Sequence, residues 1–175
     1  QGEGLINDAC GSENLDALVE LVLGKKLDLG IAHDGDGDRV RFVGPNGKVI
    51  DGDQILGLLA SYAHRVNPLL NKSFVATAHS NSGLAEFLNK QGIHFHSSDI
   101  GDRNVRQLMK QTDTNWGGES SGHIICENYL PTGDGAFAAL SILECIRHQS
   151  LSLEELAKDV VLWPSQSEAF FGKSK

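Results

Sequence analysis

Three aspartates alternate with two glycines in the sequence DGDGDR, residues 34–39, directly after the apolar stretch LDLGIAH, residues 27–33. Like charges at this spacing repel one another, so a positive partner is expected among Asp34, Asp36 and Asp38. A ligand set made only of oxygen atoms suits a hard cation such as Mg²⁺ or Ca²⁺ rather than zinc. The loop is therefore predicted to bind a divalent metal ion, and a solvated acidic turn is the alternative.

Two known kinds of acidic loop can be compared with this one. An EF-hand calcium loop needs Gly at its sixth position and Glu at its twelfth. Counted from Asp34, these positions hold Arg39 and Pro45, so the EF-hand pattern is excluded. A phosphatase in which the first Asp of an Asp-x-Asp pair attacks phosphate remains open. The loop follows the carboxyl end of a predicted strand, where ligands of open α/β sheets bind. In a phosphatase, as in other phosphoryl transfer reactions, a metal ion and Arg39 at this position would neutralise the charge of the phosphoryl group.

A second polar loop, GGESSGH at residues 117–123, contains a carboxylate, two hydroxyls and a histidine. Such side chains on a glycine-rich turn can bind sugar hydroxyls, with Glu119 accepting hydrogen bonds from two neighbouring OH groups. The loop also fits the G-x-S-x-G pattern of serine hydrolases, which requires an apolar strand before the serine and a helix after it. TDTNW precedes the loop and the strand-like HIIC follows, so this context does not match. An ordinary hairpin loop is the other alternative.

Helix and strand patterns alternate around the two loops. Apolar residues spaced for one face of a helix, and short apolar runs typical of strands, predict the elements. Helices are expected at 12–24 (capped by Ser12), 53–65 (capped by Asp53), 82–90, 102–110, 136–148 and 152–160, and strands at 27–33, 40–44, 73–78, 93–96 and 123–126. This alternation indicates an α/β fold with mixed, largely parallel sheets flanked by helices.

The composition excludes several classes of protein. Of the 175 residues, 40% are hydrophobic and 22% are charged, which is typical of a globular protein. A net charge of -8 argues against a nucleic acid or an anionic membrane as partner. No apolar stretch approaches the roughly 18 residues of a membrane span, and the N-terminus does not resemble a signal peptide. The three widely spaced cysteines favour a reducing, cytoplasmic environment over a disulfide framework.

With both loops identified, the sequence resembles the α-D-phosphohexomutase superfamily over nearly its whole length. DGDGDR is similar to the metal loop of that family, and GESSGH is similar to its sugar-specificity loop. Five further stretches resemble the family in the same order, namely INDACGS (6–12), DGDQIL (51–56), SNSGL (80–84), IGDRNV (100–105) and TGDG (132–135). The first of these favours the branch that acts on glucosamine phosphate over the phosphomannomutase/phosphoglucomutase branch.

The resemblance implies a domain organisation. Members of the family have four domains around one cleft, with the metal loop in the second domain and the sugar loop in the third. Residues 1–66 would then be the C-terminal part of domain 2, residues 67–162 would be domain 3, and residues 163–175 would begin a linker towards a fourth domain. The sequence contains no match to the phosphoserine motif of domain 1, because TAHSN at 77–81 has its serine and histidine exchanged. Domains 1 and 4 are therefore expected to be missing partners of this chain.

The resemblance also implies roles for individual residues. Asp34, Asp36 and Asp38 would bind Mg²⁺, Arg39 and His123 would act at the reacting centre, and Glu119 and Ser121 would bind sugar hydroxyls. Arg103 follows Gly101 at the start of a predicted helix, where an anionic part of the substrate could bind.

The implied reaction interconverts glucosamine 6-phosphate and glucosamine 1-phosphate through a phosphoserine and a bisphosphorylated sugar. Ser80 of TAHSN is not expected to replace the phosphoserine, because a serine without a base or a metal beside it is inert. With domains 1 and 4 expected to be missing, this chain alone is expected to be inactive. Three other functions stay open: a phosphomannomutase/phosphoglucomutase, a Mg²⁺-dependent phosphatase with Asp34 as nucleophile, and a non-catalytic metal-binding module.

Overall fold

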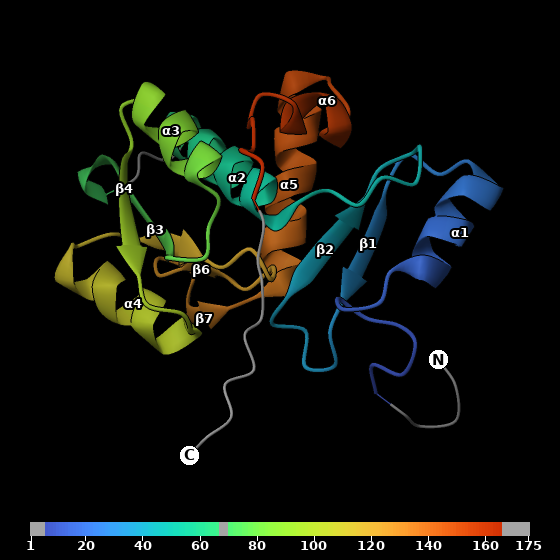
Figure 1. Ribbon diagram of the computed structural model, residues 1–175, viewed down its shortest axis with the longest axis horizontal. Coiled ribbons are helices and arrows are strands. Elements are labelled where there is room, and N and C mark those ends of the chain that lie inside the picture. Colours follow the sequence, from blue (N-terminus) through green and yellow to red (C-terminus); the bar gives the residue numbers. More distant parts are fainter. Residues whose placement is uncertain (1–5, 67–69, 166–175) are drawn as a thin grey trace, which may run out of the picture.

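The computed structural model describes residues 6–66 and 70–165 (Figure 1). The predicted division between residues 66 and 67 and most of the predicted linker at 163–175 involve residues outside these ranges, so both stay predictions. In chain order the elements are α1 (Asp16–Lys25), β1 (Gly30–His33), β2 (Val40–Val43), α2 (Gly52–Val66), η1 (Leu70–Lys72), β3 (Ser73–Thr77), α3 (Ser82–Lys90), β4 (His94–Ser98), α4 (Asp102–Gln111), β5 (Trp116–Gly118), β6 (Ile124–Cys126), β7 (Leu130–Gly133), α5 (Gly135–Gln149) and α6 (Leu153–Ala157).

The strands form two sheets, and the expected α/β class with mixed pairing is confirmed. Strands β1 and β2 form an antiparallel pair, and the other five form a sheet in the order β4-β3-β5-β6-β7. Parallel pairing is confined to β4, β3 and β5, whereas β6 and β7 run antiparallel to their neighbours. The short connections from β5 to β6 and from β6 to β7 explain this difference, because a parallel crossover needs a dozen or more residues.

Helices cover both faces of the five-stranded sheet. On one face, Val75 of β3 and Ile125 of β6 pack against Val105 and Met109 of α4. On the other face, α2, α3, α5 and α6 gather around a larger core, which includes the fully buried Phe74 of β3. Residues 52–63 of α2 are all buried, as expected for a helix enclosed by other elements rather than lying at a surface.

The two-stranded sheet shares this larger core. Val40 and Phe42 of β2 belong to the same cluster of buried residues as Leu56 of α2 and Ile142 of α5, while α1 covers the other side of β1 and β2. Figure 1 shows β2 lying beside α5, in agreement with their contacts. The hairpin that carries the acidic loop is therefore packed directly against the part of the chain that carries the second loop.

Two predicted caps are wrong. Ser12 is buried and does not cap α1, which begins four residues later with Leu15 at its N-cap and without a side-chain cap. Asp53 lies inside the first turn of α2 and is not its cap. Asp51 caps the helix instead, because its Oδ1 accepts a 2.8 Å hydrogen bond from the backbone N–H of Asp53. At α2 the neighbouring Asp51 is the better-placed polar residue, whereas at α1 the helix starts too far along the chain for Ser12 to cap it.

Two short strands, β5 and β7, were not predicted. Their sequences, WGG and LPTG, contain glycine and proline, which are depleted in strands. Glycine is tolerated in β5 because the backbone lies close to its neighbours: a Cβ on Gly118 would lie 2.7 Å from the His123 carbonyl oxygen. The helix at 82–90 was predicted with its observed bounds, and Asn81 caps it through a 2.9 Å hydrogen bond from the Gly83 N–H.

Candidate metal and sugar site

The acidic loop is the connection between β1 and β2, and it brings the three predicted metal ligands together. One carboxylate oxygen from each of Asp34, Asp36 and Asp38 lies within 4.8 Å of the other two. Asp36 is exposed, whereas the other two side chains are partly buried. Three carboxylates converging from one short loop supply the oxygen donors that Mg²⁺ and Ca²⁺ prefer. The donor set therefore fits a hard divalent cation, and metal binding stays a prediction.

Arg39 supplies part of the positive charge that the crowded carboxylates need. Its Nε lies 3.8 Å from Oδ2 of Asp34 and 3.9 Å from Oδ1 of Asp38, and its backbone N–H donates a 3.1 Å hydrogen bond to Oδ1 of Asp34. Burial alone would raise the pKa of Asp34, but the Arg39 hydrogen bond and charge, with other hydrogen bonds, bring that pKa below its ordinary value. Glu13, which sequence reasoning missed, also contacts the guanidinium at 3.4 Å.

His123 joins the second loop to the first. Its Nδ1 lies 3.0 Å from Oδ2 of Asp38, and its side chain is almost completely buried. Burial raises the pKa of Asp38, and the Asp34 carboxylate adds to this effect, while the charge of a protonated His123 opposes it. The ring is thus held through one nitrogen, and the other nitrogen, Nε2, is buried without a hydrogen-bond partner among the described residues.

The backbones of the two loops are also bonded to each other. Arg39 and His123 form an isolated antiparallel bridge, and the N–H of Val40 donates a 3.1 Å hydrogen bond to the carbonyl of Gly122. Gly122 has a φ of +98°, and a Cβ there would overlap the Val40 carbonyl oxygen. The structure therefore places the acidic loop and the second polar loop, for which metal and sugar binding were predicted separately, side by side.

Glu119 is held by the start of α4. Its Oε1 accepts a 3.0 Å hydrogen bond from the N–H of Gly101, which precedes the first residue of that helix. Ser121 lies in the same turn, and its Oγ is buried without a hydrogen-bond partner in the described part of the chain. Arg103 is exposed in the first turn of α4, close in sequence to the residue that holds Glu119. The three predicted substrate-binding residues therefore belong to one loop and the helix start attached to it.

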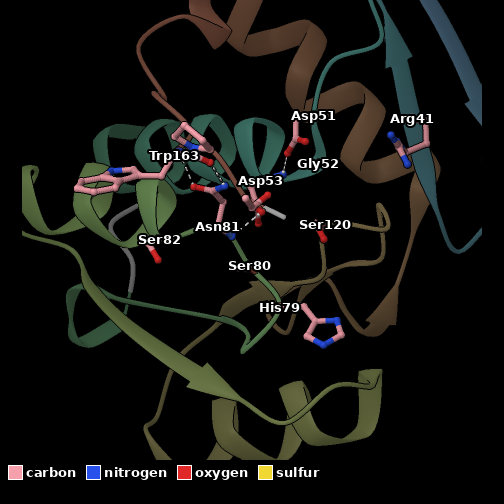
Figure 2. A pocket seen from close by; sticks show the side chains of 12 residues that line it. Arg41, Asp51, Gly52, Asp53, His79, Ser80, Asn81, Ser82, Ser120 and Trp163 are labelled. Atoms are coloured by element: carbon pink, nitrogen blue, oxygen red, sulfur yellow. Dashed lines mark hydrogen bonds between the residues drawn. The ribbon is translucent and has the colours of Figure 1, made fainter. Parts of the chain in front are cut away.

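A hollow among the described residues lies beside this site rather than at it. A pocket of about 470 Å³ lies at the starts of α2 and α3, and Figure 2 shows the side chains that line it. Its lining residues come from five segments, and they are Arg41, Asp51–Asp53, His79–Ser82, Ser120 and Trp163–Ser165. Ser120 belongs to the second loop, but none of the predicted site residues lines the pocket. Asp53 is buried here, and burial raises its pKa even though the N–H of Asn81 donates a 2.7 Å hydrogen bond to its Oδ2.

Comparison with known proteins identifies the family. The family model "Phosphoglucomutase/phosphomannomutase, alpha/beta/alpha domain III" matches residues 51–162. The chain belongs to this family. A phosphoglucosamine mutase from Bartonella bacilliformis is 44% identical over 153 residues, which are 87% of this chain and 34% of the relative. One from Oceanobacillus iheyensis is 40% identical over 159 residues, which are 91% of this chain and 36% of the relative.

Solved structures of phosphohexomutases have the same fold. A phosphoglucomutase/phosphomannomutase family protein from Burkholderia thailandensis aligns with a TM-score of 0.75 at 24% identity, over 84% of this chain and 32% of that one. The chain spans about a third of the length of the curated relatives that it matches. In the described part of the chain, no helix is long and apolar enough to cross a membrane.

Proposed function

We propose that the protein to which this chain belongs interconverts glucosamine 6-phosphate and glucosamine 1-phosphate. Two observations support the proposal: the similarity to phosphoglucosamine mutases, at 44% identity for the first of them, and the junction of the two loops. The junction carries the argument, because Asp38, a predicted metal ligand, and His123, a candidate proton carrier, are in contact at 3.0 Å. The three free cysteines are consistent with action in the cytoplasm.

The carboxylates of the acidic loop would hold Mg²⁺, which when bound supplies positive charge beside the phosphoryl group that is transferred. Arg39 places a second positive charge at the same point, since its guanidinium lies within 4 Å of two of these carboxylates. The nucleophile in this proposal is a phosphoserine elsewhere in the whole protein, as in the family that the chain resembles. This chain would then supply charge neutralisation and substrate orientation.

His123 would hold or move the proton of a sugar hydroxyl. When Asp38 accepts the hydrogen bond from Nδ1–H, Nε2 of the neutral imidazole is a proton acceptor, and it becomes a donor once the ring is protonated. The Asp38 contact also fixes the orientation of the ring, which a general acid–base group requires. In the described part of the chain, Nε2 of the closely packed His123 ring has no hydrogen-bond partner.

Glu119 and Ser121 would bind the sugar hydroxyls, and Arg103 would bind an anionic group of the substrate. Because Gly101 occupies one oxygen of Glu119, the other oxygen is available to a hydroxyl. The unpartnered Oγ of Ser121 is a second polar group in the same turn that a sugar hydroxyl could satisfy.

A chimera tests the proposal directly. The segment of the Bartonella bacilliformis phosphoglucosamine mutase that matches this chain is replaced by the chain itself, and mutase activity is measured with glucosamine 6-phosphate, glucose 1-phosphate and mannose 1-phosphate. We expect turnover with a preference for glucosamine 6-phosphate. We also expect a large loss of kcat in Asp36→Asn, a substitution at an exposed position that should leave the fold intact.

Other outcomes point to the alternative functions. A preference for glucose or mannose phosphate would assign the chain to the phosphomannomutase/phosphoglucomutase activity. Release of inorganic phosphate, with beryllofluoride bound at Asp34, would indicate a phosphatase. A correctly folded chimera with neither activity nor affinity for hexose phosphates would refute the proposal in favour of a non-catalytic module.

A further inference from the structure

The turn between β7 and α5, with the sequence TGDG at residues 132–135, lies against both loops of the site, yet none of the roles proposed above involves it. Its first glycine, Gly133, faces the ring of His123. A Cβ added to Gly133 would lie 2.6 Å from Nδ1 and 2.7 Å from Nε2 of that imidazole. No side chain larger than a hydrogen atom fits there unless the ring moves, and a moved ring would lose the 3.0 Å contact with Asp38.

The second glycine, Gly135, lies against the metal loop itself. Its N–H donates a 3.0 Å hydrogen bond to the carbonyl of Gly37, between two of the predicted metal ligands. A Cβ on Gly135 would lie 2.5 Å from the Arg39 carbonyl oxygen and 2.6 Å from Nδ1 of His33. That nitrogen of His33 lies 3.0 Å from the Arg39 carbonyl oxygen, so a larger residue at position 135 would disturb the His33 ring at one end of the loop and the Arg39 backbone at the other.

The residue between the two glycines anchors the turn. The Oδ1 of Asp134 accepts a 2.8 Å hydrogen bond from the N–H of Phe137 and so caps α5, a helix of 15 residues with a buried face. The backbone N–H of Asp134 donates to the carbonyl of Ile124 in β6 at 3.3 Å. The turn is therefore attached to a helix and to a strand of the core, and it can act as a fixed surface for the two loops.

We propose that Gly133 and Gly135 are positioning residues of this site. Gly133 sets the plane of the His123 ring so that Nδ1 reaches Asp38, and Gly135 sets the path of the metal-loop backbone through its hydrogen bond to Gly37. Neither residue touches substrate or metal in this arrangement. The consequence for metal binding rests on the proposed function, whereas the effect of Gly133 on the ring can be measured in the metal-free chain.

Alanine substitutions in the 175-residue chain test both roles. Gly133→Ala and Gly135→Ala are compared with Gly24→Ala, a matched control because a Cβ at position 24 would meet no atom within 4 Å. Calorimetric titration with MgCl₂ is expected to show roughly tenfold weaker binding for the two site variants, the size typical of losing a group that orients a metal ligand. The Gly24→Ala variant is expected to bind as the parent chain does.

A double substitution makes the ring contact testable without metal. In a His123→Ala background the space beside Gly133 is empty, so Gly133→Ala is expected to lower the thermal unfolding midpoint far less there than in the parent chain. The ¹⁵N signals of the His123 imidazole, recorded at one pH in the metal-free chain, are expected to move in Gly133→Ala and to stay in place in Gly24→Ala. If Gly133→Ala alone does not fold, recovery of the fold in the double variant supports the proposal.

Two results would overturn the inference: an equal loss of stability from Gly133→Ala with and without the His123 ring, or unchanged imidazole signals together with unchanged Mg²⁺ affinity in both site variants. A parent chain that binds no Mg²⁺ would count against the proposed metal site alone, because the double substitution and the imidazole signals would still decide the role of Gly133.

Discussion

Asn81 ties the last described segment of the chain to two helices, and its replacement by alanine has a predictable cost. Its Oδ1 accepts hydrogen bonds from the N–H of Gly83, at 2.9 Å, and from the N–H of Trp163, at 2.8 Å. Its Nδ2 donates to the Trp163 carbonyl at 2.8 Å. Figure 2 shows the contacts with Trp163, with Asn81 between Asp53 and Trp163. Alanine removes all three side-chain bonds and keeps the backbone bond to Asp53.

The size of the effect follows from these contacts. Loss of an N-cap side chain typically costs about 1 kcal/mol. The two bonds to Trp163 are exposed, so each is expected to contribute about 0.5–1 kcal/mol, the low part of the usual range. The sum is a loss of about 2–3 kcal/mol in the free energy of unfolding. For a chain of this size, that corresponds to a decrease of roughly 5–10 °C in the thermal midpoint.

Circular dichroism melting and urea titration measure this change, with the exposed neighbour Ser82→Ala as control. Asn81→Ser separates the two contributions, because serine can cap α3 but is too short to bond the backbone of Trp163 on both sides. We expect Asn81→Ser to lose about half as much stability as Asn81→Ala. A decrease of less than 2 °C for Asn81→Ala, or equal losses for the two variants, would show that the Trp163 bonds do not hold the segment.

Four further predictions concern the site and its surroundings. The loop at 34–38 should bind Mg²⁺ with millimolar affinity, and calorimetry should show no binding heat when its three aspartates are changed to Asn. Glu119→Ala in the chimera should weaken hexose phosphate binding in both reaction directions by about 1.5–3 kcal/mol, and normal kinetics would exclude its role. The 175-residue chain alone should give no turnover in a coupled mutase assay, because the phosphoserine of the first domain and the fourth domain, both expected outside this chain, would have to be positioned at the site for phosphoryl transfer. Since burial raises the pKa of Asp53 above its ordinary 3.8, the ionised form costs stability, so unfolding free energy should fall, relative to that of Asp53→Asn, as the pH rises above about 3.8.

The features that the sequence predicted well are those formed by residues close together along the chain. The spacing of Asp34, Asp36 and Asp38 is enough to predict a converging set of carboxylates, because two intervening glycines allow a tight loop. The helix at 82–90 was predicted with the observed bounds because its cap, its apolar face and its end are all local signals. In both cases the contacts that matter lie within one turn of the chain.

Contacts between the loops depend on strand register, which local patterns do not encode. His123 and Asp38 are 85 residues apart, and their 3.0 Å contact depends on how β6 is placed against β2 by the core between them. The bond from Gly101 to Glu119 likewise depends on where α4 begins relative to β5. The signal that could have shown these contacts is the cluster of glycines around the second loop, since glycine is expected where backbones or rings approach closely.

The shared core explains how a chain with two sheets can hold one site. In the proposed phosphoryl transfer, the rate would depend mainly on the positions of charged and proton-carrying groups, so the distance between the acidic loop and His123 would have to be fixed. If the hairpin of β1 and β2 were joined to the rest only through its loop, that distance would vary with the loop. Instead Val40 and Phe42 of β2 are fully buried in one cluster with α2 and α5, and α5 begins at the turn that contacts both loops. The position of the metal loop relative to His123 is thus set by buried apolar contacts, and the polar contacts between the loops follow from it.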